Sequence, residues 1–124
     1  MLNNGHVLGA AAALLTAWVL LREKPDEEAE AIRSLALDLD DEGAAVFADI
    51  KGFSRPPIIN GHIPDVFALM DDGSQLAVEF ENERSVRRTH ARRQDKAFTK
   101  WAKASPKKRA YVQEIIPGGK GRRS

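Results

Sequence analysis

The stretch PDVFALMDDGSQLAVEFEN, residues 64–82, decides the fold, because it consists of two apolar runs joined by a polar turn. The turn reads Asp, Asp, Gly, Ser, and a connection of this length and composition predicts an antiparallel hairpin between strands at about 64–70 and 75–82. Side chains alternate between the two faces of a strand, so Glu79 and Glu81 share one face of the second strand.

Three acids are expected to converge on this hairpin. A turn at 71–74 sets residue 70 opposite residue 75, which brings Asp65 near position 80 and within reach of Glu79 and Glu81. Like charges this close repel, and an apolar strand solvates them poorly, so a cation or basic partner must neutralise them. Mg²⁺ commonly binds one or two carboxylates and leaves its other positions to water and substrate phosphate. The pattern therefore predicts a metal site that faces a phosphodiester.

The sequence around the hairpin predicts an α/β (α+β) fold. Apolar residues at helical spacing, a run of strand formers and a loop with adjacent prolines precede it, and a helix and a strand follow. We expect, in chain order, a helix at 26–42, a strand at 44–50, a loop at 51–63, the hairpin, a helix at 85–104 and a strand at 109–116. The strands on either side of the second helix have the crossover length that parallel pairing requires, so the sheet should be mixed.

The second helix is expected to turn one face toward the sheet. Its uncharged or apolar positions fall at steps of four, four, four and three, which is the spacing of one helix face. These positions are Val86, His90, Gln94, Phe98 and Trp101. Phe98 and Trp101 are expected in the core.

Length and composition indicate one domain. The chain has 124 residues, of which 43% are hydrophobic and 30% charged, and it contains no Cys, which excludes a disulfide framework and cysteine-based zinc sites. We assign the domain to residues 24–117, after an apolar N-terminal helix at 1–23 and before a basic, flexible tail at 118–124. A cytoplasmic location is expected.

Residues 7–21 are free of charge and almost continuously apolar. As a helix they would reach about 22 Å, which is shorter than a bilayer core of about 30 Å. A helix packed on the domain or on a second copy, as in a homodimer, is the first interpretation; a membrane anchor and a signal peptide are the alternatives. If the segment did insert, Arg22 and Lys24 after it would leave the domain in the cytoplasm.

The charges divide the chain into two parts. Residues 1–83 hold 5 Lys/Arg and 16 Asp/Glu, a balance of −11, whereas residues 84–124 hold 14 Lys/Arg and 2 Asp/Glu, a balance of +12. A basic segment this dense is typical of a surface that binds polyphosphate. The alternative is a solvated face that pairs with the acidic half of the same fold.

These features together resemble the PD-(D/E)XK, or restriction-endonuclease-like, nuclease superfamily. The resemblance covers about residues 26–117 and rests on the order of elements, on Gly-His-Ile-Pro-Asp at 61–65 and on Val-Glu-Phe-Glu-Asn at 78–82. It implies an αβββαβ core in which Asp65 and Glu79 bind Mg²⁺ or Mn²⁺. The third motif position, usually Lys, is Glu81 here, similar to the Glu-x-Glu form of some restriction enzymes. Lys51 and Lys96 are candidates for the missing lysine.

The second helix resembles a further family feature, an inward Gln followed by an aromatic residue four positions later. Here these are Gln94 and Phe98, where related nucleases have Tyr at the second position. The resemblance implies a metal-dependent nuclease, acting on nucleic acid and in the first instance DNA, with the catalytic residues Asp65, Glu79, Glu81 and Gln94. The expected nucleic-acid contacts are Lys51, Arg87, Arg88, Arg92 and Lys96.

Two other functions stay open on the sequence. Because Glu81 replaces lysine, the domain could bind nucleic acid or a protein partner without cutting. Alternatively, its acids and bases could simply pair within a structural domain, which predicts no affinity for nucleic acid at physiological salt.

Overall fold

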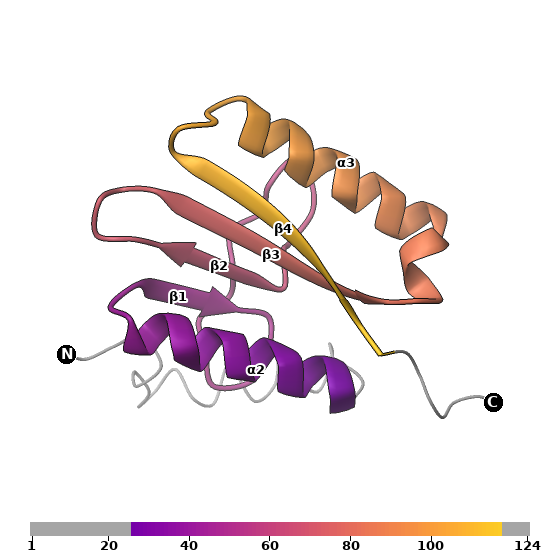
Figure 1. Ribbon diagram of the computed structural model, residues 1–124, viewed down its shortest axis with the longest axis horizontal. Helices are drawn as coiled ribbons and strands as arrows, with labels where there is room; N and C mark the ends of the chain where they lie inside the picture. The colour runs from indigo at the N-terminus through magenta and orange to yellow at the C-terminus, as the bar shows by residue number, and fades with distance from the viewer. Residues whose placement is uncertain (1–25, 118–124) are drawn as a thin grey trace.

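The computed structural model describes residues 26–117, which form a four-stranded mixed sheet with a helix on each face (Figure 1). The elements, in chain order, are α2 (Asp26–Asp41), β1 (Ala45–Ala48), β2 (Val66–Leu69), β3 (Gln75–Asn82), the 3₁₀ helix η2 (Ser85–Arg87), α3 (Thr89–Lys103) and β4 (Arg109–Ile116). The strand order is β1-β2-β3-β4; the first two pairs are antiparallel and β3 pairs parallel with β4. The predicted order of helices and strands and the mixed sheet are confirmed.

The β2–β3 hairpin has a different register from the predicted one. Leu69 pairs with Gln75, so the connection consists of five residues, 70–74, where the sequence predicted four. Continued one step beyond β2, this register sets Asp65 opposite Glu79 rather than near position 80. Directly opposed residues of an antiparallel pair point to the same face, so the correction moves the two acids closer together.

The fifth turn residue is explained by two backbone hydrogen bonds. The N–H of Met70 donates to the carbonyl of Ser74 (2.9 Å), and the N–H of Gly73 donates to the carbonyl of Met70 (3.0 Å). Gly73 has a φ of +88°, a conformation that glycine adopts without steric cost. The Asp72 carboxylate also accepts hydrogen bonds from the N–H and the hydroxyl of Ser74, at 2.9 and 2.6 Å. Met70 is thus the first residue of the turn, whereas the sequence predicted it as the last residue of the strand.

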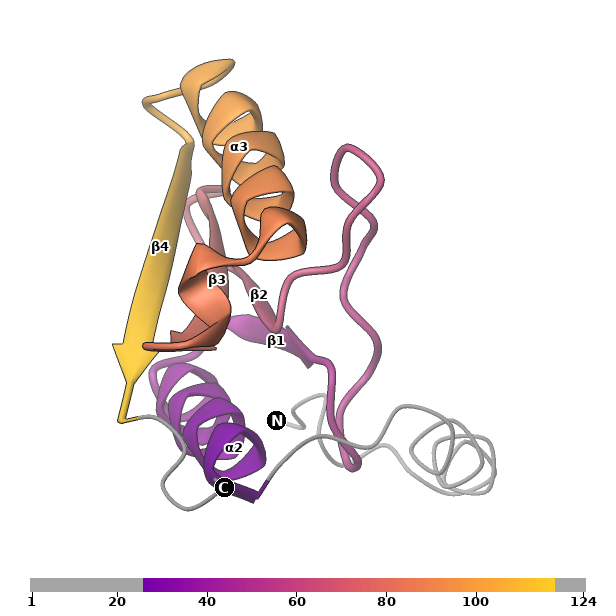
Figure 2. The ribbon, with the colours of Figure 1, turned by 90° about the vertical axis from the view of Figure 1, so that its right-hand side faces the viewer.

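The core is divided between the two faces of the sheet. Figure 2 shows α2 and α3 well separated, with β1, β2 and β3 between them. The face toward α2 carries the larger cluster, whose buried members include Ile32, Ala36, Val46, Val66, Val78 and Phe80. The face toward α3 carries a smaller one made of Ile59, Ala77 and Phe98, with Phe67, Trp101 and Tyr111 packed against it. The α3 face therefore has room for polar groups beyond its apolar part.

The single helix predicted for residues 85–104 is wrong at its start. A 3₁₀ turn, η2, is followed by Arg88 in extended conformation (φ −75°, ψ 152°), and the α-helix begins at Thr89. The buried residues of α3 are Ala91 and Phe98, whereas the predicted inward residue His90 is exposed. His90 leaves the inner face because it is eight residues before Phe98, which places it about 80° away around the helix, whereas Ala91 is seven residues before Phe98 and returns to almost the same direction.

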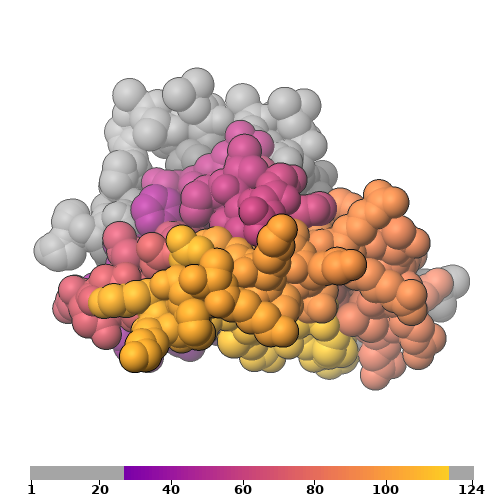
Figure 3. Space-filling model, turned by 90° about the horizontal axis from the view of Figure 1, so that it is seen from above, coloured from indigo at the N-terminus to yellow at the C-terminus, as the bar shows by residue number. Residues whose placement is uncertain are grey.

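The segment between β1 and β2 is a long connection with one tight turn. Ile59 and His62 exchange two backbone hydrogen bonds (2.7 and 3.0 Å) around Asn60 and Gly61, which both have positive φ, 49° and 86°. This is the geometry that Asn-Gly favours in two-residue hairpins. The side-chain amide of Asn60 donates to the carbonyl of Ala97 in α3 (3.0 Å). Figure 3 shows this segment, in magenta, lying against α3, in orange.

The expectations for residues 1–23, including the apolar run at 7–21, and for the tail at 118–124 lie outside the described residues. Within residues 26–117, no helix combines the length and the apolar character needed to cross a membrane.

Phe98 is completely buried and links α3 to the sheet. Replacing it by Ala should lower the free energy of unfolding by about 3–5 kcal/mol, because the ring loses its transfer free energy and leaves a cavity. Urea unfolding of the two proteins measures the difference. Ile58→Ala is the control, since Ile58 is 69% exposed and should change stability by no more than about 0.5 kcal/mol. A Phe98→Ala effect as small as that of the control would contradict the packing described.

Candidate functional site

Two carboxylates are interlocked on the α3 face, where β2 begins. The backbone N–H of Asp65 donates to Oε1 of Glu79 (3.1 Å), and the backbone N–H of Phe80 donates to Oδ2 of Asp65 (2.8 Å). Both side chains are almost completely buried, with 2% of Asp65 and 5% of Glu79 exposed. The structure thus brings these two predicted site residues together.

The local sequence explains why Asp65 is held so firmly. Pro64, also buried, has no N–H to satisfy and fixes its own φ at the entrance to β2. The carbonyl of Asp65 accepts the N–H of Asp49 from the β1 side (2.9 Å), while its own N–H is directed to Glu79 on the β3 side. Asp65 is therefore tied to both neighbouring strands just before regular pairing begins.

Glu81 lies two residues further along β3, on the same face, and is held separately. Its Oε1 accepts a hydrogen bond from the hydroxyl of Ser85 (2.6 Å). Ser85 belongs to a turn in which the side chain of Asn82 accepts the N–H groups of Arg84 (2.9 Å) and Ser85 (2.7 Å). The end of β3 thus directs Glu81 toward the start of η2, while Glu79 is directed toward Asp65.

The donor groups of these residues suit a hard divalent cation only in part. Among residues 26–117, no group of three or more His, Asp or Glu side chains is arranged to hold a metal ion. Mg²⁺, however, commonly binds through one or two carboxylates and completes its shell with water and substrate phosphate. Asp65 and Glu79 fit such a two-carboxylate site, and ligation by Glu81 stays a prediction.

β4 adds polar residues to this face that sequence reasoning missed. In the parallel register Gln113 pairs with Glu79 and Tyr111 pairs with Ala77, so both lie on the α3 face, next to β3. Their side chains are half-buried. Parallel pairing was predicted, but its register depends on where α3 ends, and nothing in the sequence fixes that to within one residue.

Two further acids were also missed, Asp49 and Asp95. Asp49 is 2% exposed and follows β1, where its N–H bonds to Asp65. Asp95 is half-buried in α3, beside Gln94. Asp49 could have been predicted as a candidate, because an acid directly after an apolar strand is expected at the edge of the sheet. Nothing in the sequence marked Asp95 as a candidate, because it stands among basic residues and off the predicted inner face of the helix.

Tyr111 lies close to several of these acids. Burial of its side chain, together with the negative charge of Asp95, raises the pKa of the phenol above its ordinary value, and the charges of Glu79 and Glu81 act in the same direction. The hydroxyl oxygen is buried and, within the described residues, makes no hydrogen bond. Tyr111 is therefore a neutral donor beside the acidic site.

The predicted nucleic-acid contacts all lie at the surface. Arg87 and Arg88 are exposed before α3, Arg92 and Lys96 are exposed on it, and Lys51 is exposed after β1. Arg88, Arg92 and Lys96 are four residues apart, which places them on successive turns along one side of the helix. Arg88 is the N-cap of α3 and, within the described residues, makes no side-chain capping bond. Gln94 is half-buried and lies four residues before Phe98, on the same side of the helix as that ring.

Two histidines meet where the loop reaches the start of α3. The rings of His62 and His90 have centroids 5.9 Å apart, and the ring of His62 also lies 6.2 Å from that of Phe98. His62 is three residues before Asp65, so this contact stands at the margin of the acidic site.

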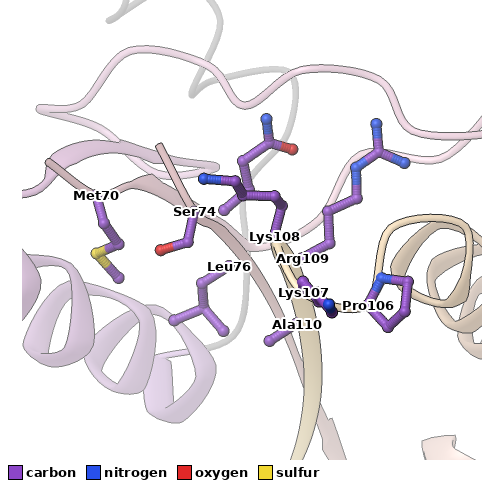
Figure 4. A pocket seen from close by; sticks show the side chains of 9 residues that line it. Met70, Ser74, Leu76, Pro106, Lys107, Lys108, Arg109 and Ala110 are labelled. Atoms are coloured by element: carbon purple, nitrogen blue, oxygen red, sulfur yellow. The ribbon is translucent and has the colours of Figure 1, made fainter. Parts of the chain in front are cut away.

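A separate hollow of about 270 Å³ opens at the opposite end of the sheet, where β3 and β4 begin (Figure 4). Its wall combines apolar side chains with a basic rim. It is lined by Met70, Ser74, Gln75, Leu76, Pro106, Lys107, Lys108, Arg109 and Ala110. Lys108 donates to the carbonyl of Asp72 (3.2 Å), and Arg109 donates to that of Trp101 (3.1 Å) and stacks on its ring. Two of its three cations are thus engaged within the fold.

Comparison with protein-family models, with curated proteins and with solved structures finds no match to this chain.

Tyr111 is the single tyrosine of the chain, so its ionisation can be followed by phenolate absorbance without interference from another tyrosine. We expect the native protein to form phenolate only above the ordinary tyrosine pKa of about 10. Asp95→Asn should move the titration to lower pH, because it removes a neighbouring negative charge. Exposed Asp38, replaced by Asn, is the control and should leave the curve unchanged. A native titration at the ordinary pH would show that Tyr111 does not face these acids.

Proposed function

We propose that the chain is a metal-dependent nuclease of the PD-(D/E)XK type. The observation that carries the proposal is the interlocked pair of Asp65 and Glu79, two carboxylates buried side by side on one face of the sheet. The Pro-Asp sequence at 64–65, the Glu-x-Glu at 79–81 and the αβββαβ order of elements support the same assignment.

The cost of this arrangement favours a functional explanation. Two carboxylates in one buried location repel each other and lose hydration, so the pair weakens the fold unless a cation compensates. Backbone N–H groups of Asp65 and Phe80 supply part of that compensation. A divalent cation would add to that compensation and would also explain why both acids occupy the same place.

The site residues then have distinct tasks. Asp65 and Glu79 would hold Mg²⁺, which when bound polarises the phosphate and lowers the pKa of a bound water. Glu81 orients the attacking water or serves as a further ligand, and Gln94 reaches the substrate backbone from α3. The exposed arginines and Lys96 bind neighbouring phosphates, so recognition is largely independent of base sequence.

A second candidate function is a nuclease fold that binds nucleic acid without cutting it. The observation in its favour is Glu81, which stands where the family usually has lysine and whose Oε1 is taken by Ser85. The two functions share the basic surface and differ in the acidic site, so metal and cleavage separate them.

Full-length protein should cleave labelled nucleic acid in Mg²⁺ or Mn²⁺ and not in EDTA. Asp65→Asn and Glu79→Gln should each lower the rate by at least about 100-fold, since each removes a charge that holds the metal. Duplex DNA, branched DNA, single-stranded DNA and RNA are compared in the same gel assay. Asp38→Asn, an exposed acid of α2, is the matched control. Intact substrate in every metal, with salt-sensitive binding retained, would establish the second function instead.

The basic side of α3 should dominate binding of duplex DNA. Arg92→Ala with Lys96→Ala should weaken binding and reduce the slope of log affinity against log salt by about 0.9 for each lost phosphate contact. Fluorescence anisotropy at several salt concentrations, in EDTA to prevent cleavage, gives both quantities. Arg33→Ala is the control, because Arg33 is an exposed arginine of α2. Equal slopes for all three proteins would place the nucleic acid elsewhere.

A further inference from the structure

Asp95 and Tyr111 occupy a place that the proposed function does not yet use. α3 joins the end of β3 to the start of β4, and since these strands are parallel the helix runs in the opposite direction. The rings of Phe98 and Tyr111 pack with centroids 5.3 Å apart, which fixes the level of the helix on the sheet. Asp95 is three residues before Phe98, so it lies about 4.5 Å further toward the end of β3 that carries Glu79.

Asp95 and Tyr111 approach the acidic site from two elements, the helix α3 and the strand β4. Three and four residues along a helix return to the same face, so half-buried Asp95 shares the inner face of α3 with Phe98. Tyr111 is opposite Ala77, two residues along the strand from Glu79, and therefore stands on the same face of the sheet as Glu79. Its hydroxyl is buried, and the charge of Asp95 is close enough to raise the pKa of the phenol. Helix and sheet therefore meet through an acid and a phenol beside the interlocked carboxylates.

A metal ion that is bound by only two carboxylates needs further polar groups nearby to accept hydrogen bonds from its water molecules. Mg²⁺ gives up its waters reluctantly, so an ion bound by two carboxylates keeps several, and these waters require acceptors. Groups that receive those hydrogen bonds, and the donors that orient them, tune metal affinity and reactivity. A donor is also scarce here, because Glu81 replaces the motif lysine and both Lys51 and Lys96 are exposed.

We propose that Tyr111 orients Asp95 as an acceptor for water molecules of a metal ion held by Asp65 and Glu79. This inference rests on the proposed function and assigns both residues a positioning role, since neither is a direct ligand. The neutral phenol supplies a hydrogen-bond donor without the positive charge that the motif lysine would bring. Asp95 supplies a carboxylate from the helix, which strands β2 and β3 do not provide.

The test measures binding of Mn²⁺ alone to the full-length protein, by calorimetry and by the paramagnetic signal of free Mn²⁺. Tyr111→Phe keeps the ring that packs on Phe98 and removes only the hydroxyl. This variant and Asp95→Asn should each bind Mn²⁺ about 10-fold more weakly, which is the size of effect seen for groups that support metal ligands. The double variant should be no weaker than either single one, because the two residues act as a unit.

Kinetics on cleavable substrate give a second readout. Tyr111→Phe should raise the Mg²⁺ concentration needed for half-maximal rate and lower kcat, while KM for nucleic acid stays unchanged. Glu114→Gln is the matched control: it removes an exposed carboxylate from β4 at a position that alternates with Tyr111 and so lies on the other face.

The outcomes distinguish this inference from the proposed function. Wild-type affinity for Mn²⁺ in both single variants, with Asp65→Asn still abolishing binding and cleavage, would overturn the positioning role and leave the nuclease intact. Failure of the wild-type chain to bind Mn²⁺ would overturn both, whereas Mn²⁺ binding without cleavage would overturn only the nuclease. Loss of thermal stability in Tyr111→Phe with unchanged Mn²⁺ affinity would show that the pair serves only to fasten α3 to β4.

Discussion

The register of the β2–β3 hairpin is the constraint on which the acidic site depends. Side chains alternate along a strand, so a shift of one residue would turn either acid to the other face. The five-residue connection at 70–74 sets Asp65 opposite Glu79. The Glu79 carboxylate then accepts the N–H of Asp65, and the Asp65 carboxylate accepts the N–H of Phe80. A loop at one end of the hairpin thus determines the chemistry near the other end.

The α3 face consequently combines an apolar part, which anchors the helix, with an acidic part, which weakens the packing. Phe98 and Ala77 make it apolar at the level where the helix is anchored, whereas Glu79 and Glu81 make it acidic toward the end of β3. The α2 face has no such division, and its cluster is the larger of the two. Stability is thereby drawn mainly from one side of the sheet, which leaves the other side free to hold groups that repel each other.

Much of this fold could be predicted from the sequence, because the signals were local. Apolar spacing predicted α2 to within a residue at its C-terminal end, and the strand β3 at 75–82 was predicted with its observed bounds. The hairpin register was wrong by one, since it depended on backbone hydrogen bonds of Met70 and Gly73 that composition does not show. The break at Arg88 was missed for a similar reason: the helical spacing continues through it, and no glycine or proline marks it.

The arrangement of the candidate site was predictable only in part. The proximity of Asp65 and Glu79 could be predicted because proline, strand period and turn lie within twenty residues of one another. Tyr111, Gln113 and Asp95 join the face through the packing of α3 and the parallel register of β4, which are long-range properties. Periodicity can say which residues share a face of one element; it cannot say which residue of another element will be level with them.

The pairing of the strands also sets the order in which the site can be assembled. Leu69 and Gln75 are six positions apart in the chain, whereas every pair between β3 and β4 joins residues 34 positions apart. The longer loop costs on the order of 1 kcal/mol more chain entropy to close. The acid pair therefore belongs to the short-range part of the sheet, and Tyr111 reaches it only when β4 docks. A disturbance that loosens α3 and β4 would separate the carboxylates from their basic helix while leaving them paired.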